Sequence, residues 1–322
     1  MKVSILDTKL AKSHISIPAI FLLVNSFPGD QNLLKFQFRK LFEDFDDIFF
    51  VSIHDKQKLV GILTLIRNRI IFNDSLLHGV TLSYMAVEKN LVPGSVTKHF
   101  KSYVNQDLFS TYDYIIGFPR KIMKGYWEMQ GFASGIIDDS ARIYFPRIKK
   151  SSKNIKCKLF TIDYFQEIKN IYLVNLKNTI VGELRSDNQW NRILSDFMQG
   201  KSSIYIYVNE DDKVCGYLIL RDKKAIEFSL LNVRSEVTNE ILNCISVLGL
   251  SSLPVSSLHL DINLLITLPT VKLVFEPKNI EKRSVIFKSR ITSLENTFKK
   301  SSVADAGEQK ISFFPILPLG YN

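Results

Sequence analysis

The sequence predicts a mixed α/β (α+β) protein of two domains, each with a mixed, mostly antiparallel sheet flanked by helices. Three observations lead to this prediction. A strand runs directly into a short aromatic helix at residues 112–132, a short repeat recurs in the two halves, and a basic polar segment separates them. The length of 322 residues also exceeds the usual size of one hydrophobic core.

The strand–helix unit is Tyr112–Phe132, which reads YDYIIGFPRKIMKGYWEMQGF. Its first seven residues are rich in β-branched and aromatic side chains, as in a central strand. Pro119 then lacks the backbone donor that would extend the ladder. The following residues indicate a helix that ends at Gly131, which can adopt the left-handed C-cap conformation. Apolar side chains recur there at helical spacing, at Ile122, Tyr126 and Met129.

The repeat consists of KLVGILTL at Lys58–Leu65 and KVCGYLIL at Lys213–Leu220. Each copy follows an alternating strand and a polar turn, so each is expected to be the second arm of an antiparallel hairpin. An amphipathic helix is expected before each hairpin. Its apolar residues are Phe36, Leu41, Phe42 and Phe45 in the first half, and Trp190, Ile193, Leu194 and Phe197 in the second.

The remaining elements follow the same patterns. In the first half we expect strands at 66–72 and 80–87, a helix at 93–109, the strand–helix unit and a closing strand at Arg142–Arg147. In the second half we expect a strand at 157–160, helices at 164–177 and 188–198, the hairpin, a strand at 225–230, a helix at 236–248, and strands near 257–261 and 271–275. The strand–helix unit has no counterpart in the second half.

These elements give the domain boundaries. The first domain is predicted over 1–148, a basic linker over 149–156, and the second, reduced domain over 157–277. The linker lies within Arg147–Lys158 (RIKKSSKNIKCK), whose charges are mixed with serine and asparagine. A tail at 278–322 begins with a basic, helix-like stretch, and its apolar residues 311–321 are expected to pack back on a domain.

Composition and charge narrow the classes of protein. Lys and Arg number 42 against 32 Asp and Glu, and this excess favours anionic partners. The apolar run Ile17–Val24 is too short to span a bilayer, so we expect no membrane span. The three cysteines are odd in number and widely spaced, which predicts neither a disulfide framework nor a metal site. A reducing cytoplasm is the expected location.

The ending W-E-x-x-G-F at Trp127–Phe132, directly after a buried strand, resembles the Y-E-x-x-G-F ending of the GNAT (GCN5-related N-acetyltransferase) superfamily. The order of paired helices, three antiparallel strands, helix, strand, helix and strand is also the layout of that superfamily. The resemblance implies tandem GNAT-like domains with a divergent second copy. It places the acyl-CoA site in the first domain.

The resemblance also implies where the coenzyme binds. GNAT enzymes hold its pyrophosphate on backbone N–H groups at the start of the third helix, where a helix has unpaired donors and a positive dipole end. The family pattern is Q/R-x-x-G-x-G/A, and Val92, Ser95 and Thr97 occupy its positions here. The alternative is an ordinary turn with Ser95 as N-cap. The implied cofactor-binding residues are Met85, Ala86, Val87, Val92, Gly94, Ser95, Val96, Thr97, Lys98 and Trp127.

Catalytic candidates also follow from the resemblance. Trp127 occupies the position of the tyrosine that acts as general acid in the family, but an indole cannot release a proton near neutral pH. Tyr126, about 100° away around the helix, is therefore the candidate acid. Glu88 and Tyr84, together with His78, are candidate bases on or beside the fourth strand. Alternatively, Tyr126 and Trp127 are a core aromatic pair, Tyr84 lies in the core, and Glu88 is a solvated surface residue.

The predicted function is an acyl-CoA-dependent N-acyltransferase, in which a small-molecule or protein amine attacks acetyl-CoA or another acyl-CoA directly, without a metal. Two alternatives stay open: a non-catalytic GNAT-fold binding module, and an aminoacyl-tRNA-dependent transferase, which would bind tRNA in a salt-sensitive way. A homo-oligomer is also possible.

Overall fold

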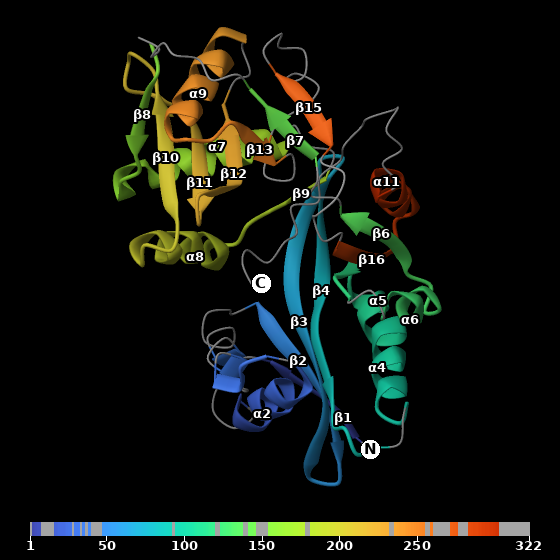
Figure 1. The fold of residues 1–322 in the computed structure, drawn as a ribbon. Helices are drawn as coiled ribbons and strands as arrows, with labels where there is room; N and C mark the ends of the chain where they lie inside the picture. Colours follow the sequence, from blue (N-terminus) through green and yellow to red (C-terminus); the bar gives the residue numbers. More distant parts are fainter. Residues whose placement is uncertain are drawn as a thin grey trace.

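The structure is a computed structural model, and it describes residues 2–7, 16–27, 29–32, 34–35, 38–39, 47–91, 94–119, 123–137, 141–145, 154–177, 181–231, 235–254, 258–259, 271–275 and 283–302. Within these residues the strands form sheets of eight, five and three strands. The largest sheet occupies the lower part of the view in Figure 1, and the five-stranded sheet lies above it. The chain is therefore a mixed α/β protein with helices on its sheets.

The first sheet is built around the long hairpin of β3 (Lys58–Phe72) and β4 (Ser75–Val87), which runs the length of the sheet in Figure 1. The separate strand predicted at 66–72 is wrong, because β3 continues through it without a turn. The sheet order is β1-β2-β3-β4-β5-β16-β6, with β9 also paired to β3. The other strands are β1 (Lys2–Asp7), β2 (Ile48–Asp55), β5 (Tyr114–Gly117), β6 (Ala133–Ile137), β9 (Val181–Glu183) and β16 (Arg283–Ser289).

Helices cover both faces of this sheet. On one face, α2 (Ser16–Ser26) packs its apolar residues against β2, β3 and β4, and we call this the α2 face. On the other, the α4 face, a continuous helical stretch is formed by α4 (Thr97–Tyr103), a π-helical turn (Val104–Leu108) and α5 (Phe109–Thr111). The short helix α6 (Lys124–Glu128) joins the same core. The helix predicted at 93–109 is therefore present, but it begins at Thr97 and ends at Thr111.

The tail of the chain contributes a strand to the first sheet. β16 lies between β5 and β6 and is antiparallel to both, so the helix-like stretch predicted from Lys278 is wrong at 283–289 and correct only from Thr292 onward. The reason is that three consecutive residues, Val285, Ile286 and Phe287, are buried on both faces of the sheet, as suits a central strand. After β16, α11 (Thr292–Ser302) packs Leu294 and Phe298 against this sheet. The apolar segment 311–321 lies outside the described residues.

The strand predicted at Arg142–Arg147 does not close the first sheet. It is present as β7 (Ala141–Tyr144), which pairs instead with β13 (Ser252–Pro254) and β15 (Lys272–Phe275) in the three-stranded sheet. Ile143 packs into the core of the second half beside Leu253. The chain therefore leaves the first sheet after β6, forms the second half, from which β9 pairs with β3, and completes the first sheet with β16.

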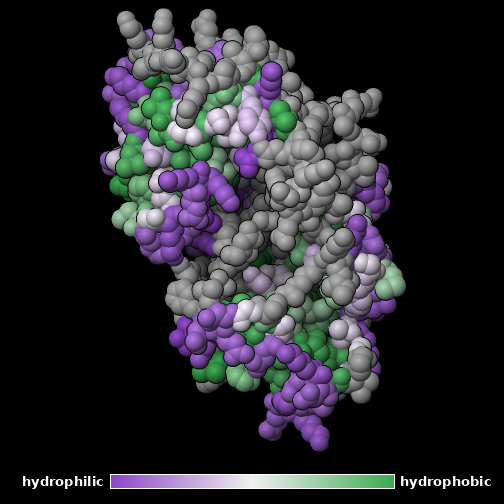
Figure 2. Space-filling view, viewed as in Figure 1, coloured by the Kyte–Doolittle hydropathy of each residue, from purple (hydrophilic) through white to green (hydrophobic). Residues whose placement is uncertain are grey.

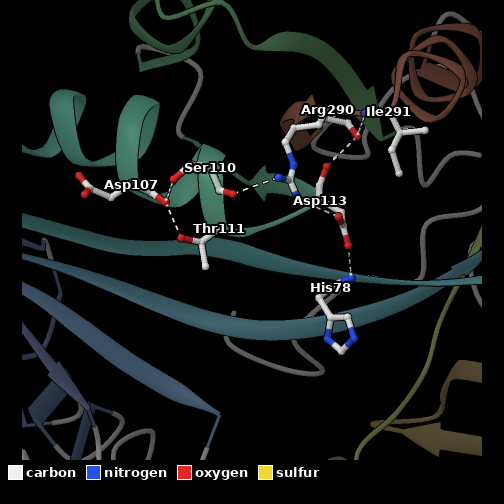
Figure 3. Close-up of polar contacts among 8 residues, drawn as sticks. His78, Asp107, Ser110, Thr111, Asp113, Arg290 and Ile291 are labelled. Atoms are coloured by element: carbon white, nitrogen blue, oxygen red, sulfur yellow. Dashed lines mark hydrogen bonds and ion pairs between the residues drawn. The ribbon is translucent and has the colours of Figure 1, made fainter.

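Asp113 fixes this return, and Figure 3 shows it between His78 and Arg290. One carboxylate oxygen accepts the His78 backbone N–H at 2.9 Å, and the other accepts Arg290 Nη2 at 2.9 Å. The carbonyl oxygen of Asp113 accepts the Ser289 hydroxyl at 2.9 Å. The end of β16 is thereby joined to β4 and to the start of β5. His78 contributes its backbone to this cluster, and its side chain points away in Figure 3.

The second sheet repeats the arrangement of β1 to β5 in the first sheet: the strands follow one another in chain order from β8 to β14, and the last pair is parallel. Its order is β14-β12-β11-β10-β8, with antiparallel neighbours except for the parallel pair β12–β14. The predicted helices near 164–177, 188–198 and 236–248 are confirmed as α7 (Phe165–Lys177), α8 (Asp187–Met198) and α9 (Ser235–Val247). The strands are β8 (Lys156–Leu159), β10 (Ser203–Val208), β11 (Val214–Arg221), β12 (Lys224–Leu230) and β14 (Leu258–His259).

Polar turns mark both hairpins of the repeat, as predicted. Lys56 in the first hairpin and Asp212 in the second both have positive φ, which is common in tight turns. The β2–β3 turn forms the hydrophilic lower end of the molecule in Figure 2. The first predicted amphipathic helix cannot be compared, because Phe36, Leu41, Phe42 and Phe45 lie outside the described residues.

A buried ionic cluster links β9 to the second sheet. Arg185, which follows β9, donates to both carboxylate oxygens of Glu227 on β12, and Tyr217 donates its hydroxyl to the same carboxylate. The Arg185 guanidinium also lies 4.2 Å from the ring centroid of Tyr172. Glu183 at the end of β9 accepts a hydrogen bond from Gln189 Nε2 at 2.6 Å. Arg185 and Glu227 neutralise each other, so Glu183 has no ion pair of its own within the described part of the chain.

Protonation of Glu183 should make stability depend on pH. Burial raises the pKa of Glu183 from 4.5 to about 7, against the opposing effect of Arg185. The folded state then binds more protons than the unfolded state between about pH 4.5 and pH 7, so stability should fall as pH rises through this range. The free energy of unfolding of the wild type should fall by about 2–3 kcal/mol from pH 5 to pH 8. Glu183→Gln should abolish this fall. Urea unfolding at both pH values measures it.

A carboxyl group at the surface provides the control for this prediction. Glu295 on α11 is partly exposed and pairs with Lys299 at 2.7 Å, so Glu295→Gln should leave the pH profile of the wild type unchanged. An unaltered profile for Glu183→Gln would contradict the assignment to Glu183.

Candidate functional site

The first sheet splits between β4 and β5. The two strands are parallel and paired from Gly79–Tyr114 to Leu82–Gly117. β4 continues to Val87 and stays paired with β3, but within the described residues no strand pairs with it on the other side beyond Leu82. We call this side of β4 at residues 83–87 its free edge, meaning only that no strand in the described part of the chain pairs with it. A free edge of this kind can bind an extended ligand through backbone hydrogen bonds.

A β-bulge lies where the split begins. Leu63 pairs with Met85 and Leu65 pairs with Leu82, so two residues of β4, Ser83 and Tyr84, face the single residue Thr64 on β3. Leu82 and Met85 consequently both pack on the α4 face, whereas Tyr84 packs on the α2 face. The Thr64 hydroxyl is buried and has no hydrogen-bond partner among the described residues. The bulge thus turns the backbone of β4 at the opening of the split.

The start of α4 packs directly on the start of β3. Gly61, the glycine of the repeat, pairs with Val87 at the end of β4. A Cβ at this glycine would lie 2.4 Å from Val96 Cγ1 and 3.2 Å from the Phe100 ring, so only glycine allows this approach. The repeat therefore marks the contact that brings the helix start beside the free edge of β4.

The loop before α4 has the features of an anion-binding helix start. Gly94 has a φ of 81°, and its carbonyl accepts the Lys98 N–H at 3.2 Å, which leaves the amides between them without intrahelical partners. The Ser95 hydroxyl is buried and unpartnered among the described residues. The N-cap is Val96, without a side-chain cap bond, so the alternative of Ser95 as N-cap is wrong.

The other residues predicted for the cofactor loop have different surroundings. The Val96 side chain is buried against Gly61, so its backbone alone is available to a ligand. Thr97 is half-buried and Lys98 is exposed. Val92 lies outside the described residues. On β4, Met85 and Val87 pack toward α4, whereas Ala86 is buried on the α2 face, so these three residues can offer a ligand their backbone groups.

Tyr126 and Trp127 form an aromatic pair in the core of the α4 face. Their ring centroids are 5.3 Å apart, and Trp127 also lies 5.4 Å from Phe132. Burial raises the pKa of Tyr126, which keeps its hydroxyl protonated at neutral pH. Trp127 is buried in this cluster rather than placed along β4. The geometry therefore supports the core interpretation of both residues.

The catalytic candidates do not lie together. Tyr84 contacts Phe27 and Phe38 edge-on, at 5.5 and 5.0 Å, on the α2 face, opposite Tyr126. Glu88, beyond the end of β4, forms an ion pair with Lys58 at 2.6 Å. The structure thus places the candidate acid Tyr126 and the candidate base Tyr84 on opposite faces of the sheet, and it pairs Glu88 with a lysine. Of the three, Tyr84 is the one in the bulge.

Sequence reasoning missed Lys288, which joins β16 to the α4 face. Its Nζ donates to Asn105 Oδ1 at 3.0 Å and to the Gln130 carbonyl at 3.1 Å, and it lies 4.7 Å from the Phe109 ring centroid. Burial lowers the pKa of Lys288. No sequence signal could identify this role, because its partners lie more than 150 residues away along the chain.

The second sheet has no comparable split in its described part. β12 pairs with β14 at Phe228–Leu258 and Ser229–His259, and the next residue, Leu230, pairs with Gly216 on β11. The parallel pairing thus reaches Ser229, the residue directly before Leu230, which pairs with the repeat glycine Gly216. The space beside Gly216 is filled by Leu230 Cδ2 at 2.5 Å rather than by a helix. The free edge found in β4 is therefore absent from described β12.

These features define a class of protein. The chain has the fold of the GCN5-related N-acetyltransferases, as expected from the sequence. A probable N-acyltransferase from Enterococcus faecalis is 15% identical over 90% of this chain and 72% of its own, with a TM-score of 0.59. A GCN5-related N-acetyltransferase from Kribbella flavida is 10% identical over 89% and 72%, with a TM-score of 0.58.

A third structure, Eis1 from Mycobacterium abscessus, is 9% identical over 89% of this chain and 73% of its own, with a TM-score of 0.55. No family model and no curated protein matches the chain. At these identities the similarity concerns the fold. Among the described residues, no helix is long and apolar enough to cross a membrane.

Proposed function

We propose that the protein is an acyl-CoA-dependent N-acyltransferase that binds its acyl-CoA in the split between β4 and β5. The free edge of β4 at residues 83–87, next to the start of α4, is the observation that supports this function most strongly. An extended pantetheine chain carries amide groups that can pair with such an edge. The phosphates would then reach the backbone N–H groups near Ser95.

The residues present fit this ligand. The Ser95 hydroxyl, buried and without a partner among the described residues, is a donor for a phosphate oxygen, and apart from the adjoining residues no described atom lies within 4 Å of a Cβ placed on Gly94. The excess of basic residues favours the same anionic ligand. No comparable set of features lies at the described part of β12.

Direct acyl transfer would need little from side chains. The acyl-CoA supplies a thioester carbonyl, which the acceptor amine attacks as the coenzyme thiol leaves. Backbone N–H groups turned by the bulge at Ser83 and Tyr84 would stabilise the developing oxyanion. Tyr84, in the bulge, is our candidate to relay the amine proton through water to the departing thiolate, and Tyr126 and Glu88 rank behind it because of their contacts.

We also propose that the protein consists of tandem GNAT-like domains. The shared order of five strands supports this, together with the repeat at Gly61 and Gly216. The first domain would comprise residues up to 137 together with 283–302, and the second the residues between them. We further propose a cytoplasmic location and a small-molecule or protein amine as acceptor.

A non-catalytic acyl-CoA-binding protein is the second candidate. The separation of Tyr84, Tyr126 and Glu88 favours it, because no acid and base converge at the split. Release of coenzyme thiol in the presence of a panel of primary amines distinguishes the two candidates. Turnover supports the enzyme, and tight binding without turnover supports the binding module.

Replacing Ser95 tests the site itself. Ser95→Leu should weaken acetyl-CoA binding about 100-fold, the effect of losing one or two charge-assisted hydrogen bonds. Isothermal titration calorimetry measures the affinity, and the wild type should bind one acetyl-CoA per chain. Ser202→Leu is the matched control, because the Ser202 hydroxyl is also buried and unpartnered but lies in the second half. Two ligands per chain, or equal affinities for both variants, would refute this placement.

A further inference from the structure

Three residues lie in one row across β3, β4 and β5, three rows before the last pair of β4 and β5, Leu82–Gly117. Asn68 pairs with Gly79, and Gly79 pairs with Tyr114. A Cβ at Gly79 would lie 2.1 Å from Tyr114 Cζ, so the tyrosine ring occupies the space that any side chain there would need. The glycine therefore allows the ring to lie across β4 and to reach β3.

Hydrogen bonds join the three strands at this row. The Tyr114 hydroxyl donates to Asn68 Oδ1 at 2.5 Å, and Asn68 Nδ2 donates to Thr81 Oγ1 at 2.5 Å. The residues are 0%, 8% and 3% exposed, respectively. Burial raises the pKa of Tyr114 well above its ordinary value, so its hydroxyl remains a donor. Both groups of the Asn68 amide thus have a partner inside the sheet.

The tyrosine ring also reaches the strand on the other side of β5. It stacks on Phe287 of β16, with centroids 5.9 Å apart and planes inclined by 18°. One side chain consequently connects β16, β5, β4 and β3. β5 itself has only four residues, so its backbone pairing with β4 is short.

We propose that Tyr114 is a positioning residue for the acyl-CoA site, because it fixes the point at which β5 leaves β4. Thr81 pairs with Ile116, immediately before the last pair, Leu82–Gly117. The hydrogen bonds from Tyr114 to Asn68 and from Asn68 to Thr81 hold the paired residues of β4 and β5 together. The adjoining free edge of β4 remains open to a ligand. Without these hydrogen bonds, the short strand β5 can shift on β4 and alter the opening. This inference rests on the proposed function.

Tyr114→Phe removes the hydroxyl and keeps the ring. We expect the dissociation constant of acetyl-CoA to rise about tenfold, the effect of losing one buried hydrogen bond. The matched control is Tyr172→Phe, which removes an equally buried hydroxyl that donates to the Glu183 carbonyl at 2.6 Å in the second half. The control should lose thermal stability to a similar extent and bind acetyl-CoA like the wild type. Equal binding by both variants would overturn the proposal.

Hydrogen exchange of the ligand-free protein separates this proposal from the proposed function. Tyr114→Phe should speed exchange of the amides at 80–82 and 115–117, whereas Tyr172→Phe should not. If the wild type binds no acetyl-CoA, the proposed function fails, and the exchange rates still decide whether Tyr114 holds the split. Asn68→Ala combined with Tyr114→Phe should have no larger effect than Asn68→Ala alone, because both act on the same bond. Additive effects would contradict the proposal that this hydrogen bond holds the strands together.

Discussion

Replacing Arg185 by methionine is expected to lower the free energy of unfolding by about 3–5 kcal/mol, because it leaves the Glu227 carboxylate buried without its cation. The two side chains are only 5% and 1% exposed, and the guanidinium lies between β9 and β12. The Tyr217 hydroxyl would still donate to this carboxylate, but it carries no positive charge. Urea unfolding at pH 7 measures the loss.

Two further variants distinguish the burial of the charge from other effects of the substitution. Arg185→Met combined with Glu227→Met should recover most of the lost stability, because no buried charge remains. Lys169→Met breaks an ion pair with Asp187, which is 87% exposed, and should cost less than about 1 kcal/mol. A loss below about 1 kcal/mol for Arg185→Met itself would show that solvent reaches Glu227.

Replacing Gly61 by alanine is expected to weaken acetyl-CoA binding about 10- to 100-fold, because overpacking of this contact must displace the start of α4. The new methyl group would lie 2.4 Å from Val96 Cγ1, and both Val96 and Phe100 are buried, with little room to move. Calorimetric titration with acetyl-CoA measures the change.

A second substitution tests this explanation. Val96→Ala removes the atom nearest to the new methyl group, so Gly61→Ala combined with Val96→Ala should bind acetyl-CoA more tightly than Gly61→Ala alone. Failure of this rescue would show that the helix start is not what Gly61 positions. The melting temperature of each variant shows whether a loss of binding reflects unfolding.

The sequence predicts elements whose partners are close along the chain. Both hairpins of the repeat form as expected, because each joins two alternating strands through a polar turn. The position of β16 could not be predicted, since it pairs with β5 more than 150 residues earlier. Its short apolar run, Val285–Phe287, fits a helix or a strand equally well without knowledge of that partner. The same limit applies to β7.

The candidate site shows a similar division. The glycine at 61 and the loop at Gly94 and Ser95 could be found from the sequence, because they lie within recognisable patterns. The bulge at Ser83 could not, and it decides that Tyr84 lies on the face opposite Tyr126. The role of Tyr114 also needed the structure, since its partner Asn68 lies two strands away.

The place of β16 has a consequence for synthesis of the protein. A ribosome releases the chain from its N-terminus, and domains generally fold in that order. Here β6 would emerge without its neighbour, and the position beside β5 would stay vacant until residue 289 has left the exit tunnel. During that interval, translation of about 150 residues exposes two unpaired strand edges, which are templates for aggregation. The first sheet thus stays incomplete during a long stage of synthesis, in which chaperones would have a clear target.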